Sequence, residues 1–364
     1  MRAARPCLLA LTLALAASAI AGYQFEGYDL QVIQEGYGLT NTDVHVARGG
    51  LFTSSWAGLT DDDVVAPDFS FPLPSGTGVS YARLSIGWWG GAADYPTTAD
   101  VTVNGNALPR LDFGGDGWTG DVGELYGEED TNPTYDPNAA SVYGAGHGMW
   151  TTCFDVTDEI ELGTTNQVTL DLPFHQIEDF DGRCYHWELV VVYETPTDFA
   201  LSYQIAEGYD SLRSSDAQML EGTVDFSGVT LTEPYTAELL LAYTHGTLAQ
   251  LDWAEFSGVQ LDGNDVADAS EPSIFIDPDV HPNRSFFDFL TFDVSDAIDE
   301  SGNPLHYYTV TDGGEWVLNL ASAVLITREA VEGGDIIPEP ATLALLGLGL
   351  LALRRRTHRH SGQR

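Results

Sequence analysis

The same series of short apolar segments occurs twice along this chain, and in the same order. Residues 82–88 (ARLSIGW) resemble residues 237–243 (AELLLAY), and the segment FDVTD at 154–158 returns as FDVSD at 292–296. Between these segments lie Asn104-Gly105 in one copy and Asp262-Gly263 in the other. An Asn-Gly or Asp-Gly pair between segments of alternating apolar and polar residues indicates a β-hairpin, because its tight turn needs residues with positive φ. The chain is therefore built from two similar units.

Most apolar segments are short and alternate between apolar and polar residues, as at 168–172 (VTLDL). Few windows before the last thirty or so residues keep a helical period for ten residues. This pattern predicts an all-β fold of two tandem, mutually similar antiparallel β-sandwich domains of the jelly-roll type. We place the first domain at 22–195 and the second at 196–332.

The N-terminal residues have the pattern of a secretory signal peptide. Arg2 and Arg5 precede an apolar stretch that predicts a signal helix, and small residues follow it. Cleavage is expected after Ala19 or Ala21, so that residues 1–21 are removed on export.

The C-terminal segment 333–364 combines a linker with three features in a fixed order. Pro338, Glu339 and Pro340 come first, then a 13-residue apolar run at 341–353, then Arg354, Arg355 and Arg356. The run predicts a short hydrophobic helix, because about 20 residues are needed to cross a bilayer. The arginines would keep their end on the cytoplasmic side. An ordinary single-span anchor is the alternative interpretation.

This tail resembles the PEP-CTERM sorting signal of exported proteins in Gram-negative bacteria. The resemblance implies processing by an exosortase, a membrane protease, after passage through the secretion machinery. It also implies a transient association with the inner membrane, followed by release to the cell surface or the extracellular space.

The body is similar to an uncharacterised family of secreted archaeal and bacterial β-rich surface proteins built around a domain of unknown function. The resemblance rests on four motifs in order, ARLSIGWW, VNG, FDVTD and LVVVYE, and covers most of residues 35 to 328. It implies the fold and the location of the protein but no mechanism, because the family has no assigned catalytic activity.

The chain is strongly acidic, with 55 acidic residues, 14 arginines, no lysine and a formal net charge of −41. The chain between residues 22 and 340 contains seven arginines and all 55 acidic residues, so its formal net charge is −48. This charge excludes nucleic acids and anionic lipid surfaces as partners. A surface screened at high salt, a store of divalent cations and a basic partner all remain compatible with it.

The exported chain keeps two cysteines, Cys153 and Cys184, because Cys7 is removed with the signal peptide. In an oxidising compartment we expect a disulfide between them.

Calcium is the only ion for which the sequence offers candidates. Its ligands would be oxygens of acidic, glycine-rich loops, since calcium takes six to eight oxygen ligands. The candidate carboxylates are Asp116, Asp121, Asp155, Asp158, Asp293 and Asp296. For the two FDV[ST]D motifs we favour a structural role, in which Phe and Val point inward and the polar residues cap a turn.

No motif identifies a catalytic site. The histidines of the body lack metal-binding spacing, and no Gly-x-Ser-x-Gly motif is present. A carboxylate pair for glycoside cleavage would have to come from 55 scattered acids, and nothing singles one out. Trp118 and Trp150, in the glycine- and aspartate-rich loop 112–150, are the best candidates for an exposed sugar-binding face. Trp88 and Trp187 are expected in the core.

The sequence thus predicts a non-enzymatic exported protein without a cofactor, with a structural or adhesive role in exopolysaccharide or biofilm. A carbohydrate-binding module using loop 112–150 is the first alternative, with extracellular polysaccharide as its partner. A secreted hydrolase is the second.

Overall fold

The computed structural model of the 364-residue chain is all-β and antiparallel. It describes residues 27–50, 69–89, 97–113, 140–145, 149–171, 183–213, 221–245, 253–261, 287–308 and 317–330. The strands within these ranges are β1 (Gly27–Thr40), β2 (Thr42–Gly50), β3 (Phe69–Pro72), β4 (Gly78–Trp89), β5 (Thr97–Val103), β6 (Asn106–Ala107), β7 (Leu111–Phe113), β8 (Ala140–Ala145), β9 (Met149–Asp155), β10 (Thr165–Asp171), β11 (Arg183–Glu194), β12 (Phe199–Arg213), β13 (Glu221–Phe226), β14 (Tyr235–His245), β15 (Trp253–Phe256), β16 (Val259–Leu261), β17 (Phe287–Asp293), β18 (Asn303–Tyr308) and β19 (Val317–Ala330).

The predicted all-β class is therefore confirmed, and these ranges contain no helix. In particular, none of the residues described forms a helix able to span a membrane. The predicted signal helix and the predicted C-terminal helix lie outside the described residues.

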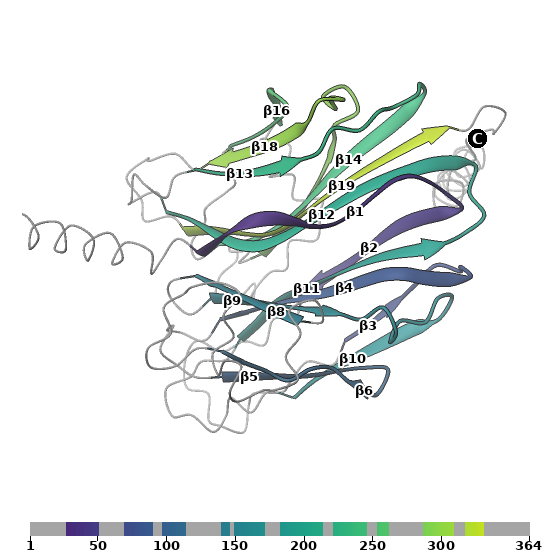
Figure 1. Ribbon diagram of the computed structural model, residues 1–364. Coiled ribbons are helices and arrows are strands. Elements are labelled where there is room, and N and C mark those ends of the chain that lie inside the picture. Colours follow the sequence, from purple (N-terminus) through teal and green to yellow (C-terminus); the bar gives the residue numbers. More distant parts are fainter. Residues whose placement is uncertain are drawn as a thin grey trace, which may run out of the picture.

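The strands form four sheets that are stacked in layers (Figure 1). We name them by position. The two inner sheets are β2-β11-β4-β9-β8, called inner sheet 1, and β1-β12-β19-β14-β17, called inner sheet 2. Outer sheet 1 is β3-β10-β5-β6, with β7 also paired to β5, and outer sheet 2 is β13-β18-β15-β16.

Each pair of adjacent sheets encloses a hydrophobic core. Leu84, Trp88 and Leu189 of inner sheet 1 pack against strands of outer sheet 1. Inner sheet 2 and outer sheet 2 share a second core, to which Leu239 and Leu325 contribute. A third core, with Val190 and Val324 among its members, lies between the two inner sheets. The inner sheets are thus buried on both faces, which explains why β11 and β19 contain continuous apolar runs.

The order of pairing within the sheets occurs twice. The series β2-β11-β4-β9 has the same sequential pattern as β12-β19-β14-β17, and β3-β10-β5-β6 has that of β13-β18-β15-β16. The predicted sequence repeat therefore corresponds to a repeated arrangement of strands.

The first strand does not follow this repeat. β1 pairs with β12, from Gly27 beside Asp210 to Thr40 beside Ala200, and so completes the edge of inner sheet 2. After Asn41, with φ at 56°, the chain enters β2 in inner sheet 1. The predicted domain boundary at residue 195 stays a prediction, and β1 lies in the sheet formed mainly by strands on the other side of it.

The turn of the second hairpin differs from the predicted position. Asn104 and Gly105 have positive φ values of 51° and 82° between β5 and β6, as expected for a tight hairpin turn. In the second copy the equivalent turn is Ser257-Gly258, with φ values of 50° and 79°, between β15 and β16. Asp262-Gly263, which the sequence pattern suggested, lies outside the described residues.

The predicted disulfide is wrong, since Cys153 and Cys184 are both free and fully buried. Cys184 on β11 lies opposite Trp88, whereas Cys153 on β9 lies opposite Ser85, with β4 between the two strands. Two strand spacings amount to about 10 Å, beyond the reach of a disulfide. Cys184 also belongs to the core with outer sheet 1, while Cys153 lies against Ser85 on the other face.

The segment 112–150 contains strands in addition to loop residues. Parts of β7, β8 and β9 lie in it, and Trp150 on β9 is completely buried in the core between inner sheet 1 and outer sheet 1. The prediction that Trp150 presents an exposed ligand surface is therefore wrong. Trp88 and Trp187 are buried, as predicted.

Candidate functional site

A network of polar side chains lies between the two inner sheets. It contains three arginines, Arg48, Arg83 and Arg328, with their carboxylate partners. These are three of only seven arginines in the body of a very acidic chain. We call these arginines and the groups that they contact the inter-sheet network.

Arg83 and Glu207 form the most buried part of the network. Arg83 on β4 donates from Nε to Glu207 Oε2 at 2.8 Å and from Nη2 to Oε1 at 2.6 Å, across the space between the inner sheets. Glu207 Oε1 also accepts hydrogen bonds from Ser141 Oγ at 3.0 Å and Tyr143 Oη at 2.7 Å. The carboxylate thus receives four hydrogen bonds from protein donors.

The electrostatics of this group favour an ionised carboxylate. Burial alone would raise the pKa of Glu207, but the guanidinium of Arg83 and the hydrogen bonds of Tyr143 and Ser141 lower the pKa overall. Burial, together with the negative charge of Glu207, raises the pKa of the Tyr143 hydroxyl and of the Cys153 thiol. A buried carboxylate that is held ionised and fully hydrogen-bonded is suited to joining two sheets, and poorly suited to donating a proton in catalysis.

Arg48 and Glu188 are paired on adjacent strands of inner sheet 1, and together they make a second contact with inner sheet 2. Arg48 Nε on β2 donates to Glu188 Oε2 on β11 at 3.0 Å, and its guanidinium lies 4.8 Å from the centroid of the Phe289 ring on β17. Ser322 on β19 donates from Oγ to Glu188 Oε1 at 2.5 Å. Groups from both inner sheets therefore surround Glu188.

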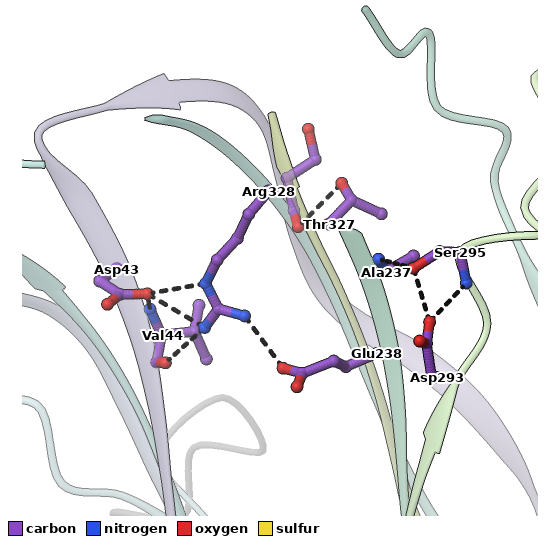
Figure 2. Close-up of polar contacts among 9 residues, drawn as sticks. Asp43, Val44, Ala237, Glu238, Asp293, Ser295, Thr327 and Arg328 are labelled. Atoms are coloured by element: carbon purple, nitrogen blue, oxygen red, sulfur yellow. Dashed lines mark hydrogen bonds and ion pairs between the residues drawn. The ribbon is translucent and has the colours of Figure 1, made fainter. Parts of the chain in front are cut away.

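Arg328 forms the third contact, which Figure 2 shows. From its place near the end of β19, it donates to Asp43 Oδ1 on β2, with distances of 3.3 Å from Nε and 3.1 Å from Nη2. Nη2 also donates to the carbonyl oxygen of Val44, and Nη1 donates to Glu238 Oε2 on β14 at 3.0 Å. One side chain thereby connects inner sheet 1 with two adjacent strands of inner sheet 2.

His186 is a further buried titratable group at this interface. It lies on β11, and its ring meets that of Phe289 edge to face, with 6.3 Å between the centroids. Gly87, its neighbour on β4, leaves room for the imidazole, because a Cβ there would lie only 2.0 Å from His186 Cε1. Burial lowers the pKa of His186 to about 3, so the ring is neutral near pH 7.

The two FDV[ST]D motifs form the same turn in both copies. Asp155 Oδ1 accepts hydrogen bonds from the backbone N–H and the Oγ1 of Thr157, and Thr157 Oγ1 accepts one from the Ala82 N–H. In the second copy Asp293, Ser295 and Ala237 make the equivalent bonds (Figure 2).

The adjacent Val156 and Val294 point into the cores, and Asp158 and Asp296 are exposed. This geometry agrees with the structural role that we favoured for the motif.

Calcium binding stays a prediction for the six aspartates. Within the described ranges, no three acidic, histidine or cysteine residues form a cluster suited to a metal ion. Asp116, Asp121 and Trp118 lie outside those ranges, as do the residues of the sorting tail.

The comparisons with known proteins identify the body of the chain. A family model described as a protein of unknown function, DUF3344, matches residues 26–328. The chain belongs to the DUF3344 family. The predicted resemblance to a family built around a domain of unknown function is thereby confirmed.

The sorting tail is confirmed as well. A model of the PEP-CTERM protein-sorting motif matches residues 337–359, directly after the DUF3344 body. The motif implies export and processing by an exosortase. No curated protein matches the chain.

Several solved structures are distantly similar to this DUF3344 protein. A peptide-N(4)-(N-acetyl-β-D-glucosaminyl) asparagine amidase is 12% identical over 80% of this chain and 98% of its own, with a TM-score of 0.25. PNGase F, a glycosylasparaginase from Flavobacterium meningosepticum, is 12% identical over 79% and 96%, with a TM-score of 0.26. An α-L-rhamnosidase from Streptomyces avermitilis is 12% identical over 86% and 29%, with a TM-score of 0.20. Likeness at this level carries no argument about function.

The inter-sheet network was not predicted from the sequence. Glu207 begins the segment Glu-Gly-Tyr at 207–209, which also occurs at 35–37 and by itself indicates only a repeat. The scarcity of arginine is the sequence feature that points to this network, since the few cations of an acidic chain are the natural partners of its buried carboxylates.

Proposed function

We propose that this protein is a non-enzymatic structural or adhesive component of an exopolysaccharide layer or biofilm. The observation that carries the proposal is the position of a sorting motif directly after a body whose buried carboxylates are bound by its own side chains. Glu188, Glu207 and Asp210 each accept hydrogen bonds from neighbouring protein groups. In this proposal these carboxylates stabilise the body through hydrogen bonds with the protein itself, and they do not bind a substrate.

We further propose that the body consists of two tandem β-sandwiches, each made of one inner and one outer sheet. The duplicated strand order and the separate cores within each pair of sheets support this division. The inter-sheet network then joins the two sandwiches into one rigid block, and this suits a protein that persists outside the cell.

In the proposed route, the signal peptide directs the chain across the inner membrane. The tail keeps it there for a short time, and exosortase processing releases it to the surface or matrix. Removal of Arg354–Arg356 should leave the chain in the wrong fraction while the body stays folded. Cell fractionation with an antibody to the body measures sorting, and protease resistance measures folding. Unchanged sorting would contradict this part of the proposal.

The structural role is tested in a deletion strain. We expect a biofilm that disperses more easily under flow, with recovery when the complete gene is restored. A gene that lacks the segment 337–359 should not restore it, and this variant is the matched control for the sorting signal. Purified full-length protein, incubated with the matrix polysaccharide, should release no new reducing ends. Sustained release, or an unchanged biofilm in the deletion strain, would overturn the proposal.

A further inference from the structure

We propose that inner sheet 2 resists tension applied at the C-terminal end of the body, with β19 as the strand that receives it. This inference rests on the proposed structural role, in which the protein is held within a layer exposed to flow. The sorting motif begins at residue 337, and β19 ends at Ala330. Only a short segment separates them, so a pull on the C-terminal end of the body reaches β19 before any other strand that the structure describes.

β19 is held along both of its edges. It pairs with β12 over its whole length, from Val317 beside Arg213 to Ala330 beside Phe199. On the other edge it pairs with β14 from Leu318 to Glu329. A strand at the centre of a sheet leaves it only when both sets of hydrogen bonds break.

Both faces of β19 are held as well. Leu320 and Leu325 lie in the core with outer sheet 2, and Val324 and Ile326 lie in the core between the inner sheets. Ser322 and Arg328 add polar contacts to inner sheet 1, through Glu188 and Asp43. Arg328 is two residues from the end of β19, close to the point at which tension would enter.

The direction of the strands decides how the sheet responds. β1 and β19 are both antiparallel to β12, and therefore run parallel to each other. Gly27 lies opposite Asp210, near the start of β19, whereas Thr40 lies opposite Ala200, near its end. The start of β1 and the end of β19 therefore lie at opposite ends of inner sheet 2 (Figure 1).

A pull on these two ends acts along the strands, while the hydrogen bonds between antiparallel strands run across them. All bonds of a pair of strands then share the force. A pull on two adjacent strands at the same end would instead open the bonds one after another.

Single-molecule pulling on the full mature chain tests the proposal. Asp29→Cys with Glu329→Cys places handles at opposite ends, and Asp198→Cys with Glu329→Cys places them at the same end of β12 and β19. Asp29 and Asp198 are exposed, and the native Cys153 and Cys184 are buried away from reagents. Both designs pull on β19 at Glu329; they differ in the second strand that is pulled, β1 or β12, and in the direction of the force relative to the strands.

We expect the 29/329 pair to unfold at a severalfold higher force than the 198/329 pair. Arg328→Gln should lower the force for the 29/329 pair, whereas Arg110→Gln, at a surface ion pair with a 3.8 Å separation, should leave it unchanged. Equal forces for the two handle pairs would overturn the proposal. A biofilm without phenotype in the deletion strain would overturn the proposed function alone, since the pulling result does not depend on it.

Discussion

At the scale of single residues, the inter-sheet network shows how an acidic chain uses its few cations. Arg83 is buried with Glu207, whereas Arg110 lies at the surface 3.8 Å from Asp100. Removing water from two charges costs free energy, and their attraction offsets this cost only while both are present. The network therefore makes each partner dependent on the other.

Replacement of Arg83 by Met should destabilise the protein by about 3–5 kcal/mol, because it leaves Glu207 buried without its cation. Urea unfolding monitored by tryptophan fluorescence measures this loss. Arg110→Met is the matched control and should cost less than about 1 kcal/mol, since exposed ion pairs contribute little. Equal losses in the two variants would contradict the proposed importance of burial.

His186 predicts how stability depends on pH. Its pKa is lowered to about 3 in the folded protein, whereas an unfolded histidine titrates near 6.5. Below pH 6.5 the unfolded chain therefore binds a proton that the folded chain does not. The contribution of His186 to stability is fully present above pH 6.5 and is lost as the pH falls below that value. The slope for this one group approaches about 1.4 kcal/mol per pH unit.

The measurement is the free energy of unfolding between pH 7.5 and pH 5, in the parent and in His186→Gln. The variant loses stability at all pH values through repacking, but it should lack the histidine's contribution to the slope. Parallel curves for the two proteins would rule out this role of His186.

At the scale of elements, a buried asparagine organises one turn in each copy of the repeat. Asn166 Oδ1 accepts from the Glu161 N–H and its Nδ2 donates to the Glu161 carbonyl, and Asn303 makes the same pair of bonds with Asp299. Both asparagines are fully buried. Asn166 also accepts from Asn104, and Asn303 from Ser257, so each asparagine connects its own turn to the neighbouring hairpin.

Asn166→Ala and Asn303→Ala should each destabilise the protein by about 2 kcal/mol or more, because each leaves buried backbone groups without partners. Asn106→Ala, at an exposed position on β6, is the control and should have little effect. Thermal unfolding followed by circular dichroism compares the three. A large loss in only one of the two buried variants would show that the turns are not equivalent.

At the scale of the whole molecule, the shared core and the inter-sheet network connect the two halves. Val44 and Val190 of inner sheet 1 pack against Leu201 and Val324 of inner sheet 2. We therefore expect the body to unfold in a single transition, with calorimetric and van't Hoff enthalpies in agreement. Two separate transitions would show that the halves are independent.

The net charge of −41 predicts a response to salt. Added sodium chloride should raise the melting temperature, because screening reduces the repulsion between carboxylates. An additional rise with millimolar calcium at constant ionic strength would support specific sites among the predicted aspartates. No increase with either salt would contradict both ideas.

Much of this architecture follows from local signals, and the rest depends on contacts between distant residues. The alternation in β4 and β14 and the turn at Asn104-Gly105 predicted strands and a hairpin, because backbone geometry alone dictates those patterns. The partner of β1, the pairing of Arg83 with Glu207 and the burial of Trp150 depend on how sheets stack. No spacing within a short window encodes such contacts.

The pairing of β1 with β12 has a consequence for export. In the proposed route the N-terminal signal leads the chain across the membrane, so β1 emerges long before β12, which lies some 160 to 180 residues later. All strands of inner sheet 1 precede β12 in the chain and can pair first, whereas β1 of inner sheet 2 has no place to pair until β12 has arrived. The first strand to cross the membrane is thus among the last to be paired, and until then it is open to proteases and chaperones outside that membrane.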